Sequence, residues 1–203
     1  MRLIGMLDSP YVRRVAVSLK LMDVPFVLEQ LSVFRNFEQV RTINPVVKVP
    51  TLVTDQGTML MDSSLILDHV ERLAGPERSL MPASGPARDQ ALHILGLALA
   101  ANEKAVQLYY ERTLRPADKQ HQPWIDRVSG QLVDAFAALE KEAKADAAWF
   151  AGERIMQPDI TVAVAWRFVR HAVPDVVAAE AFPRLAAHAA RAEALPAFVE
   201  TGF

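Results

Sequence analysis

Residues 44–64 read NPVVKVPTLVTDQGTMLMDSS, and this stretch predicts two short strands joined by a turn and followed by a helix. Pro50 opens an apolar run, and a proline is tolerated as the first residue of a strand because no donor is lost from the strand interior. Gly57 supplies the positive φ that a hairpin turn requires. Asp62 precedes an apolar helical run, as an N-cap residue does. The stretch is therefore expected to form a strand pair that ends at a helix start.

The same stretch predicts a binding surface. We expect the Val49-Pro50 bond to be cis, which turns the backbone N–H and C=O of Val49 outward as a free edge for a peptide-like ligand. Asp62-Ser63-Ser64 starts a helix, and its serine hydroxyls and helix-start amides are expected to face the same space. Several polar groups should thus converge on one small ligand.

Composition limits the class of protein. The chain has 203 residues, of which 51% are hydrophobic and 23% charged, as in an ordinary globular protein. A net charge of −2 gives no electrostatic basis for binding nucleic acid or an anionic membrane. No apolar run reaches the roughly 18 to 20 residues of a membrane span, and the apolar N-terminus meets Asp8 too early for a signal peptide. A cytoplasmic location without membrane or nucleic-acid partners is expected.

Cysteine is absent from the sequence. Protein disulfides, thiolate metal sites and any mechanism in which the protein supplies a thiol are therefore excluded. The five histidines show no metal-ligand spacing, so no metal is expected. Any thiol chemistry must use a thiol that the ligand brings.

Two domains are predicted. Strand and helix patterns alternate through residues 1–78, which predicts a mixed four-stranded sheet with helices packed against it. Pro, Gly and Ser then cluster in a linker at residues 79–87, and strand patterns cease beyond it. Residues 88–203 are predicted to be all-helical, with a central helix at 158–173 that is apolar nearly all round.

These features together resemble the cytosolic glutathione transferase superfamily, and the likeness extends over the whole chain. The first helix begins with a Ser-Pro-aromatic motif, and the strand pair carries Val-Pro followed by an acidic-Ser pair. Serine-type bacterial members are the most similar, because no tyrosine ends the first strand and there is no cysteine. The matching residues are Ser9-Pro10-Tyr11-Val12-Arg13-Arg14, Val49-Pro50 and Asp62-Ser63.

The resemblance implies a thioredoxin-like domain joined to a helical domain, commonly as a homodimer. It implies that glutathione binds the first domain as co-substrate, and that a small apolar electrophile binds in the cleft between the two domains. The implied reaction is conjugation in detoxification, or reduction of a peroxide as a side activity. The alternative is a non-catalytic relative that kept the fold as a binding or assembly module. A third possibility, disulfide exchange through the protein's own thiol, is excluded by the missing cysteine.

Roles carry over to single residues by the resemblance. Ser9 matches the hydroxyl that donates a hydrogen bond to the glutathione sulfur. Val49 matches the residue whose backbone pairs with the cysteinyl part, and Pro50 matches the cis-proline. Asp62 and Ser63 match the pair that holds the γ-glutamyl end.

Structural alternatives stand beside these roles. Ser9 and Ser64 are also suited to plain helix caps, and Asp62 to a solvated turn. Lys48 matches a basic residue near the glycyl carboxylate, but its pattern equally fits a surface lysine. The combination of motifs favours the functional role for Ser9.

The second substrate is expected to contact Tyr109, Arg112 and Trp166, which are aromatic or polar-tipped, although such residues are also common in cores and interfaces. Arg13 and Arg14 are adjacent, so they point about 100° apart on a helix and cannot both face the ligand. One of them is predicted to make an interdomain or dimer contact.

One position departs from the resemblance. Members of the superfamily usually have Ser or Thr before the aspartate that starts the central helix, whereas this chain has Met156 before Pro158-Asp159. Losing a capping hydroxyl costs about 0.5 to 2 kcal/mol. Asp159 is expected to favour the helix N-terminus by its charge.

Overall fold

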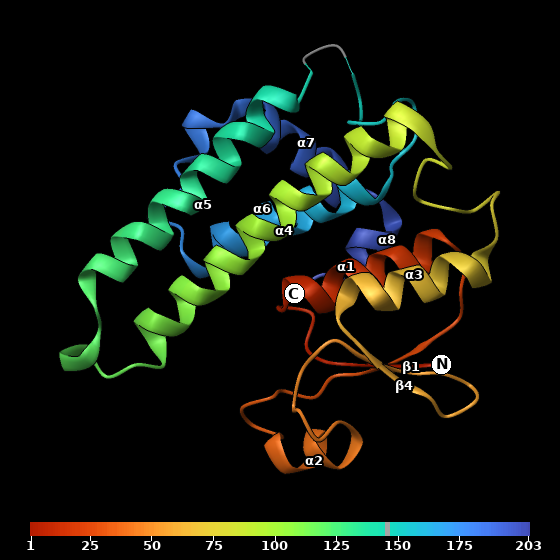
Figure 1. Ribbon diagram of the computed structural model, residues 1–203, viewed down its shortest axis with the longest axis horizontal. Coiled ribbons are helices and arrows are strands. Elements are labelled where there is room, and N and C mark those ends of the chain that lie inside the picture. Colours follow the sequence, from red (N-terminus) through yellow and green to blue (C-terminus); the bar gives the residue numbers. More distant parts are fainter. Residues whose placement is uncertain (145–146) are drawn as a thin grey trace. The chain divides into compact units, whose positions relative to one another are not determined.

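The computed structural model describes residues 1–144 and 147–203. The chain forms two compact units (Figure 1). The first comprises Met1–Leu80 together with Ala194–Phe203, and the second comprises Met81–Glu193.

The first unit contains a mixed four-stranded sheet, as predicted. Its strands are β1 (Arg2–Ile4), β2 (Val27–Glu29), β3 (Thr51–Val53) and β4 (Met59–Met61). They lie in the order β2-β1-β3-β4, with β1 parallel to β2 and the other neighbours antiparallel. Strand β1 ends at Ile4 because Gly5 has a φ of 139°, outside the range that a strand uses.

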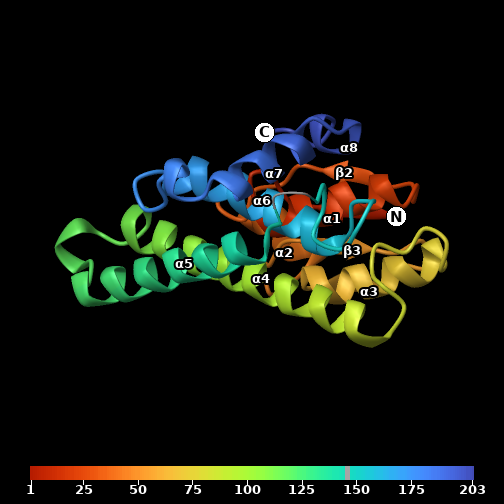
Figure 2. The same cartoon turned by 90° about the horizontal axis from the view of Figure 1, so that it is seen from above.

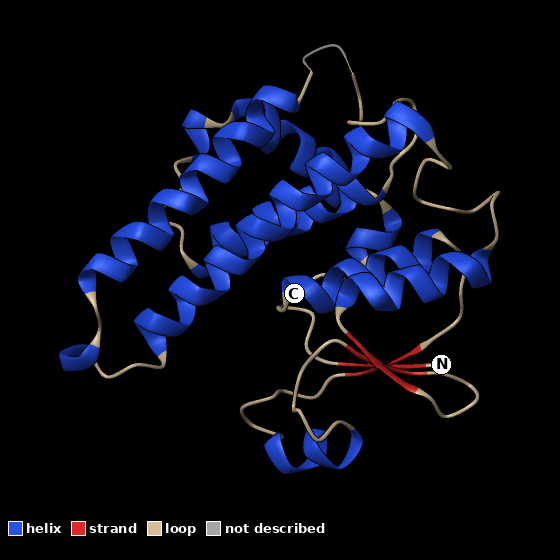
Figure 3. Ribbon diagram, viewed as in Figure 1, coloured by secondary structure: helices blue, strands red, loops and turns tan. Residues whose placement is uncertain are grey.

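Helices cover both faces of this sheet. Helix α1 (Pro10–Leu21) and helix α3 (Ser63–Ala74) pack together on one face, and the short α2 (Phe37–Ile43) lies on the other (Figures 1 and 3). Pro10 occupies the first turn of α1, where a missing N–H costs nothing. Every residue of α1 from Val12 to Leu19 is buried. This thioredoxin-like layering fixes the starts of α1 and α3 relative to the strands.

The last ten residues differ from the prediction. They were expected in the helical domain, but Ala194–Phe203, including helix α8 (Pro196–Val199), belongs to the first unit. Arg13 explains the difference, because its buried guanidinium donates hydrogen bonds to the carbonyl oxygens of Thr201 (2.9 Å) and Phe198 (3.2 Å). Arg13 therefore makes a contact within the first unit.

The second unit is helical in its described residues, as predicted. It contains α4 (Gly85–Thr113), α5 (Gln122–Glu142), α6 (Gln157–Ala172) and α7 (Pro183–Glu193), with 3₁₀ turns at Ala117–Lys119 and Ala179–Ala181. Helices α4 and α5 run side by side, and α6 packs against α4 and α7 (Figures 1 and 2). Helix α6 is buried along most of its length, which explains its apolar sequence.

The start of α6 is held by a carboxylate. Met156 is the N-cap residue, as the sequence indicated, and Asp159 binds its backbone N–H at 2.9 Å. The second oxygen of Asp159 accepts a hydrogen bond from the Phe150 amide at 2.8 Å. Asp159 is fully buried, and this burial raises the pKa of its carboxyl to about 6 against the opposing effect of the two amide hydrogen bonds. Asp159 thus caps α6 and also joins its start to the preceding loop at Phe150.

Candidate functional site

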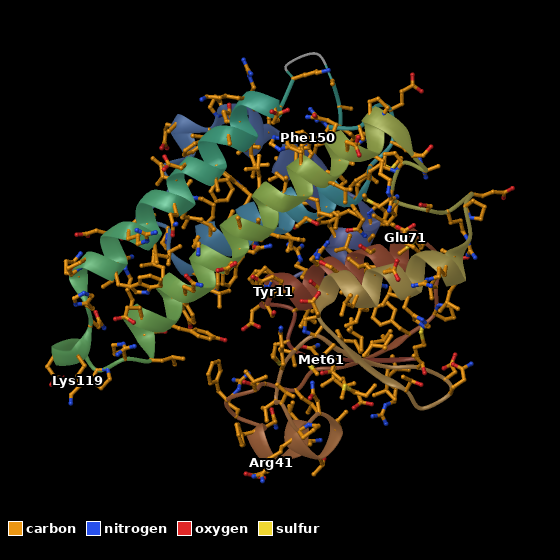
Figure 4. All side chains as sticks on the ribbon, in the orientation of Figure 1. Tyr11, Arg41, Met61, Glu71, Lys119 and Phe150 are labelled. Atoms are coloured by element: carbon orange, nitrogen blue, oxygen red, sulfur yellow. The ribbon has the colours of Figure 1, made fainter. Side chains whose placement is uncertain are left out.

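Strand register brings three segments to one edge of the sheet. The end of β1 at Ile4 lies opposite Thr51 at the start of β3, and Thr51 lies opposite Met61 at the end of β4. The loop to α1, the Val49-Pro50 step and the start of α3 therefore leave the sheet at the same edge. Figure 4 labels Met61 at this edge and Tyr11 in the first turn of α1.

Ser9 is the N-cap residue of α1. Its Oγ accepts a hydrogen bond from the Val12 amide at 3.4 Å, a long distance for such a bond. A hydroxyl has one proton to donate besides its acceptor capacity. Within the described residues no acceptor for the Ser9 proton is found. The capping role and a role as a donor to a ligand are therefore compatible.

Gly5 allows the start of α1 and the Val49-Pro50 step to pack closely. A Cβ at this position would lie 2.5 Å from Cγ2 of Val12 and 3.1 Å from Cβ of Val49. Both distances are below ordinary van der Waals contact, and a φ of 139° is itself unfavourable for other residues. Glycine at this position therefore lets the start of α1 approach the Val49-Pro50 step.

Hydrogen bonds hold the loop before β3. Nδ2 of Asn44 donates to the carbonyl of Lys48 (3.1 Å) and to Oγ1 of Thr51 (2.8 Å). Oγ1 of Thr51 also donates to the Lys48 carbonyl, at 2.6 Å. The Val49-Pro50 bond is cis, and no hydrogen-bond partner for the Val49 amide occurs in the part of the chain that the structure describes. The backbone of Val49 is thus fixed in place with its N–H unused.

Asp62 is the N-cap residue of α3. Its Oδ1 accepts hydrogen bonds from the amides of Ser64 (2.9 Å) and Leu65 (3.4 Å), which leaves Oδ2 for another donor. Its φ of 73° is rare for a residue other than glycine and costs about 1 to 3 kcal/mol. Such strain concentrates at ligand clamps.

Arg14 is a site residue whose partners the sequence did not reveal. Its Nη1 donates to the hydroxyl oxygens of Ser63 (2.9 Å) and Ser64 (3.2 Å), which joins α1 to the start of α3. The side chain is buried, and burial lowers the pKa of its guanidinium to about 10, opposed by the nearby charge of Asp62. Arg14 therefore remains positively charged at neutral pH.

Lys48 and the residues expected to contact the second substrate have different surroundings. Lys48 is exposed. Arg112 forms an ion pair with Asp175 (2.9 Å), and Tyr109 is partly buried. Trp166 is only 7% exposed and packs edge-on against Phe136, with 5.6 Å between ring centroids. Trp166 is therefore part of the core of the second unit, which does not favour a role in substrate binding.

Two further observations concern the described residues only. No group of three or more potential metal ligands gathers among them. No helix among them has the length and apolar character needed to cross a membrane.

Comparison with known proteins agrees with this geometry. Sequence profiles for "Glutathione S-transferase, N-terminal domain" and "Glutathione S-transferase, C-terminal domain" match residues 3–78 and 122–191. The "Uncharacterized GST-like protein YibF" of Escherichia coli (strain K12) is 27% identical over 144 residues, which are 66% of this chain and 71% of that protein.

Solved structures are similar over nearly the whole chain. A glutathione S-transferase from Methylobacterium radiotolerans, in complex with glutathione sulfonate, is 27% identical with a TM-score of 0.89, covering 98% of this chain and 93% of that one. A glutathione transferase family member from Pseudomonas fluorescens Pf-5, with bound glutathione, is 30% identical with a TM-score of 0.86, covering 98% and 97%. The chain belongs to the glutathione transferase superfamily.

Proposed function

We propose that the protein is a glutathione transferase in which the Ser9 hydroxyl stabilises the thiolate of bound glutathione for attack on a small apolar electrophile. The convergence of Ser9, Val49 and Asp62 at one edge of the sheet carries this proposal. Structures of similar proteins with glutathione and with S-(propanoic acid)-glutathione support the choice of ligand.

Each part of glutathione has a matching group. The unused N–H of Val49 and its C=O suit the cysteinyl backbone, which would add as a short strand. The free Oδ2 of Asp62 suits the α-amino group of the γ-glutamyl end, with Ser63 beside it. Lys48 is exposed, and its ammonium group can donate a hydrogen bond to the glycyl carboxylate.

The energetics of Ser9 are of the required size. A thiol has an ordinary pKa of about 8.5, so it is only slightly ionised at neutral pH. A hydrogen bond to a charged acceptor contributes about 1.5 to 3 kcal/mol, which equals a pKa shift of about one to two. The N-terminus of α1 adds about 0.3 to 1 kcal/mol. Ser9 would act as a donor and not as a nucleophile, because no base among the described residues is hydrogen-bonded to its hydroxyl.

The test compares the bound thiol in two proteins. Ser9→Ala should raise the pKa of bound glutathione by about one to two, read from the ultraviolet absorbance of the thiolate during a pH titration. The matched control is Ser84→Ala, which removes the N-cap serine of α4, a hydroxyl without a capping hydrogen bond. An unchanged thiol pKa in Ser9→Ala would refute the role of Ser9. A wild type that binds glutathione but consumes it with no halide, epoxide or hydroperoxide would instead indicate a non-catalytic binding module.

We further propose a cytoplasmic homodimer that takes part in detoxification, with peroxide reduction as a side activity. Leu65 and Leu73 on α3 are 66% and 52% exposed, and a second copy would cover such apolar surface. Sedimentation should give the mass of a dimer. A monomer at micromolar concentration would contradict this part of the proposal without affecting the role of Ser9.

A further inference from the structure

A pocket of about 240 Å³ lies inside the second unit, and none of the residues proposed to hold glutathione lines it. Residues 143–144 after α5, residues 147–150 and helix α7 form its walls. Its polar and aromatic lining residues are Lys144, Trp149, Phe150, Arg184, His188 and Arg191.

The lining is positively charged. Lys144, Arg184 and Arg191 contribute cations, and no carboxylate lines the pocket among the described residues. The guanidinium of Arg184 donates to the carbonyl of Ala143 at 3.1 Å, and that of Arg191 donates to the carbonyl of Ala148. Neutral acceptors fix the direction of the two arginines without cancelling their charge. Each guanidinium keeps further N–H groups for an anion.

Two carboxylates, of Glu140 and Asp159, lie beside the pocket without lining it, and neither is hydrogen-bonded to the guanidinium group of Arg184 or Arg191. Both oxygens of Glu140 on α5 accept hydrogen bonds from backbone amides, of Arg184 and Leu185, at 2.9 Å. Asp159 at the start of α6 accepts hydrogen bonds from the amides of Phe150 (2.8 Å) and Met156 (2.9 Å). The three lining cations exceed these two negative charges, so the pocket favours an anion.

One wall of the pocket is aromatic. The rings of Trp149 and Phe150 lie 5.5 Å and 4.9 Å from the ring of His188, and the Arg191 guanidinium lies over Trp149 at 5.8 Å. Nε2 of His188 is 3.2 Å from the backbone carbonyl of Asp159, which can only accept, so Nε2 carries the proton. Burial also lowers the pKa of His188 to about 4, so the three rings of this wall are uncharged at neutral pH.

We propose that this pocket binds a small aromatic carboxylate, with its ring against Trp149 and Phe150 and its carboxylate at Arg184 and Arg191. Guanidinium groups pair with carboxylates through two parallel hydrogen bonds. A cavity of about 150 Å³ already holds benzene, so the pocket has room for one ring and its acid group. Neither a flat neutral molecule nor a small ion alone would use both features.

The test uses benzoate as probe and benzamide as its neutral counterpart. The protein is saturated with glutathione, so that binding at the glutathione site is blocked. Benzoate should bind saturably and shift the indole N–H resonance of Trp149, which Trp149→Phe identifies, whereas benzamide should bind at least tenfold more weakly. Arg184→Gln combined with Arg191→Gln should lower the benzoate affinity at least tenfold.

Two controls separate this site from general charge effects and from misfolding. Arg127→Gln removes an exposed positive charge from α5 outside the pocket, and should leave the benzoate affinity unchanged. Lys144→Gln removes an exposed pocket cation with little effect on packing, and should weaken benzoate severalfold at an unchanged melting temperature. The proposal is overturned if benzoate does not bind, if benzamide binds equally well, or if Arg127→Gln has the same effect as the pocket variants.

Discussion

At the scale of single residues, Arg14 is the clearest case of a role set by tertiary structure. We predict that Arg14→Met weakens glutathione binding about tenfold or more, because Ser63 loses a charged donor that holds its hydroxyl at the start of α3. Calorimetric titration with glutathione measures this. Arg72→Met is the control. Arg72 is exposed on α3, and within the described residues it pairs only with Asp68 of the same helix. Equal affinities of Arg14→Met and wild type would show that Arg14 only supports the fold.

Asp62 allows its charge to be tested apart from its capping role. Asparagine caps helices about as well as aspartate and tolerates positive φ, so Asp62→Asn should change the free energy of unfolding by less than about 1 kcal/mol. The loss of charge should nevertheless weaken glutathione at least severalfold, because the ammonium group loses its ionic partner. Denaturant unfolding and calorimetry give the two quantities. A variant that loses stability but keeps its affinity would contradict the assignment.

Sequence alone could suggest Ser9, Val49 and Asp62 as candidates, because short local motifs contain them. The partners of Arg14 could not be read in this way, since Ser63 and Ser64 are about fifty positions away. One signal was present. Two arginines stand in a helix whose other positions are mostly apolar, and a buried arginine requires an acceptor.

At the scale of elements, the contact between the start of α6 and α7 brings together two titrating groups, Asp159 and His188, with opposite effects on stability. Burial raises the pKa of Asp159 to about 6, so its contribution to stability is complete below its ordinary pKa of 3.8 and is lost as pH rises through 6. Burial lowers the pKa of His188 to about 4, so its contribution is complete above 6.5 and is lost as pH falls through 4. The charged forms hardly coexist, so the 3.9 Å approach of the two groups is no ion pair.

The two effects oppose each other between pH 4 and 6. We predict that Asp159→Asn makes the loss of stability on acidification steeper by about 2 to 3 kcal/mol across this interval, because only the histidine effect remains. Urea unfolding at several pH values measures it. Asp126→Asn, an exposed change on α5, should leave the wild-type slope. A slope unaltered by Asp159→Asn would show that Asp159 is ionised in the folded protein throughout this range.

Element types followed from the sequence because periodicity and caps are local. The hairpin, the Ser9-Pro10 helix start and the apolar α6 all occur as predicted. Met156 alone does not indicate how the start of α6 is capped. The carboxylate of Asp159 takes the place of the missing hydroxyl, and it also binds the amide of Phe150, six residues before the cap. A capping arrangement that uses a loop outside the helix is not visible in the helix sequence.

At the scale of the whole molecule, ligand binding should couple to unfolding. Glutathione at 100 times its Kd should raise the free energy of unfolding by about 2.7 kcal/mol, if it binds only the folded state. A thermal melt with increasing glutathione measures this as a rising melting temperature. Ser9→Ala should retain most of the shift below the thiol's pKa, because Ser9 contacts only the sulfur in the proposed complex. A shift absent from the wild type would refute glutathione binding itself.

The C-terminal segment has a consequence for the order of synthesis. Residues 1–80 leave the ribosome well before 194–203, yet both belong to one compact unit. Until Phe198 and Thr201 emerge, the Arg13 guanidinium lacks the carbonyl acceptors that it has in the folded protein. The first unit therefore begins to be translated first but can be completed only last. Its Arg13 contacts cannot form until the helical unit has been synthesised.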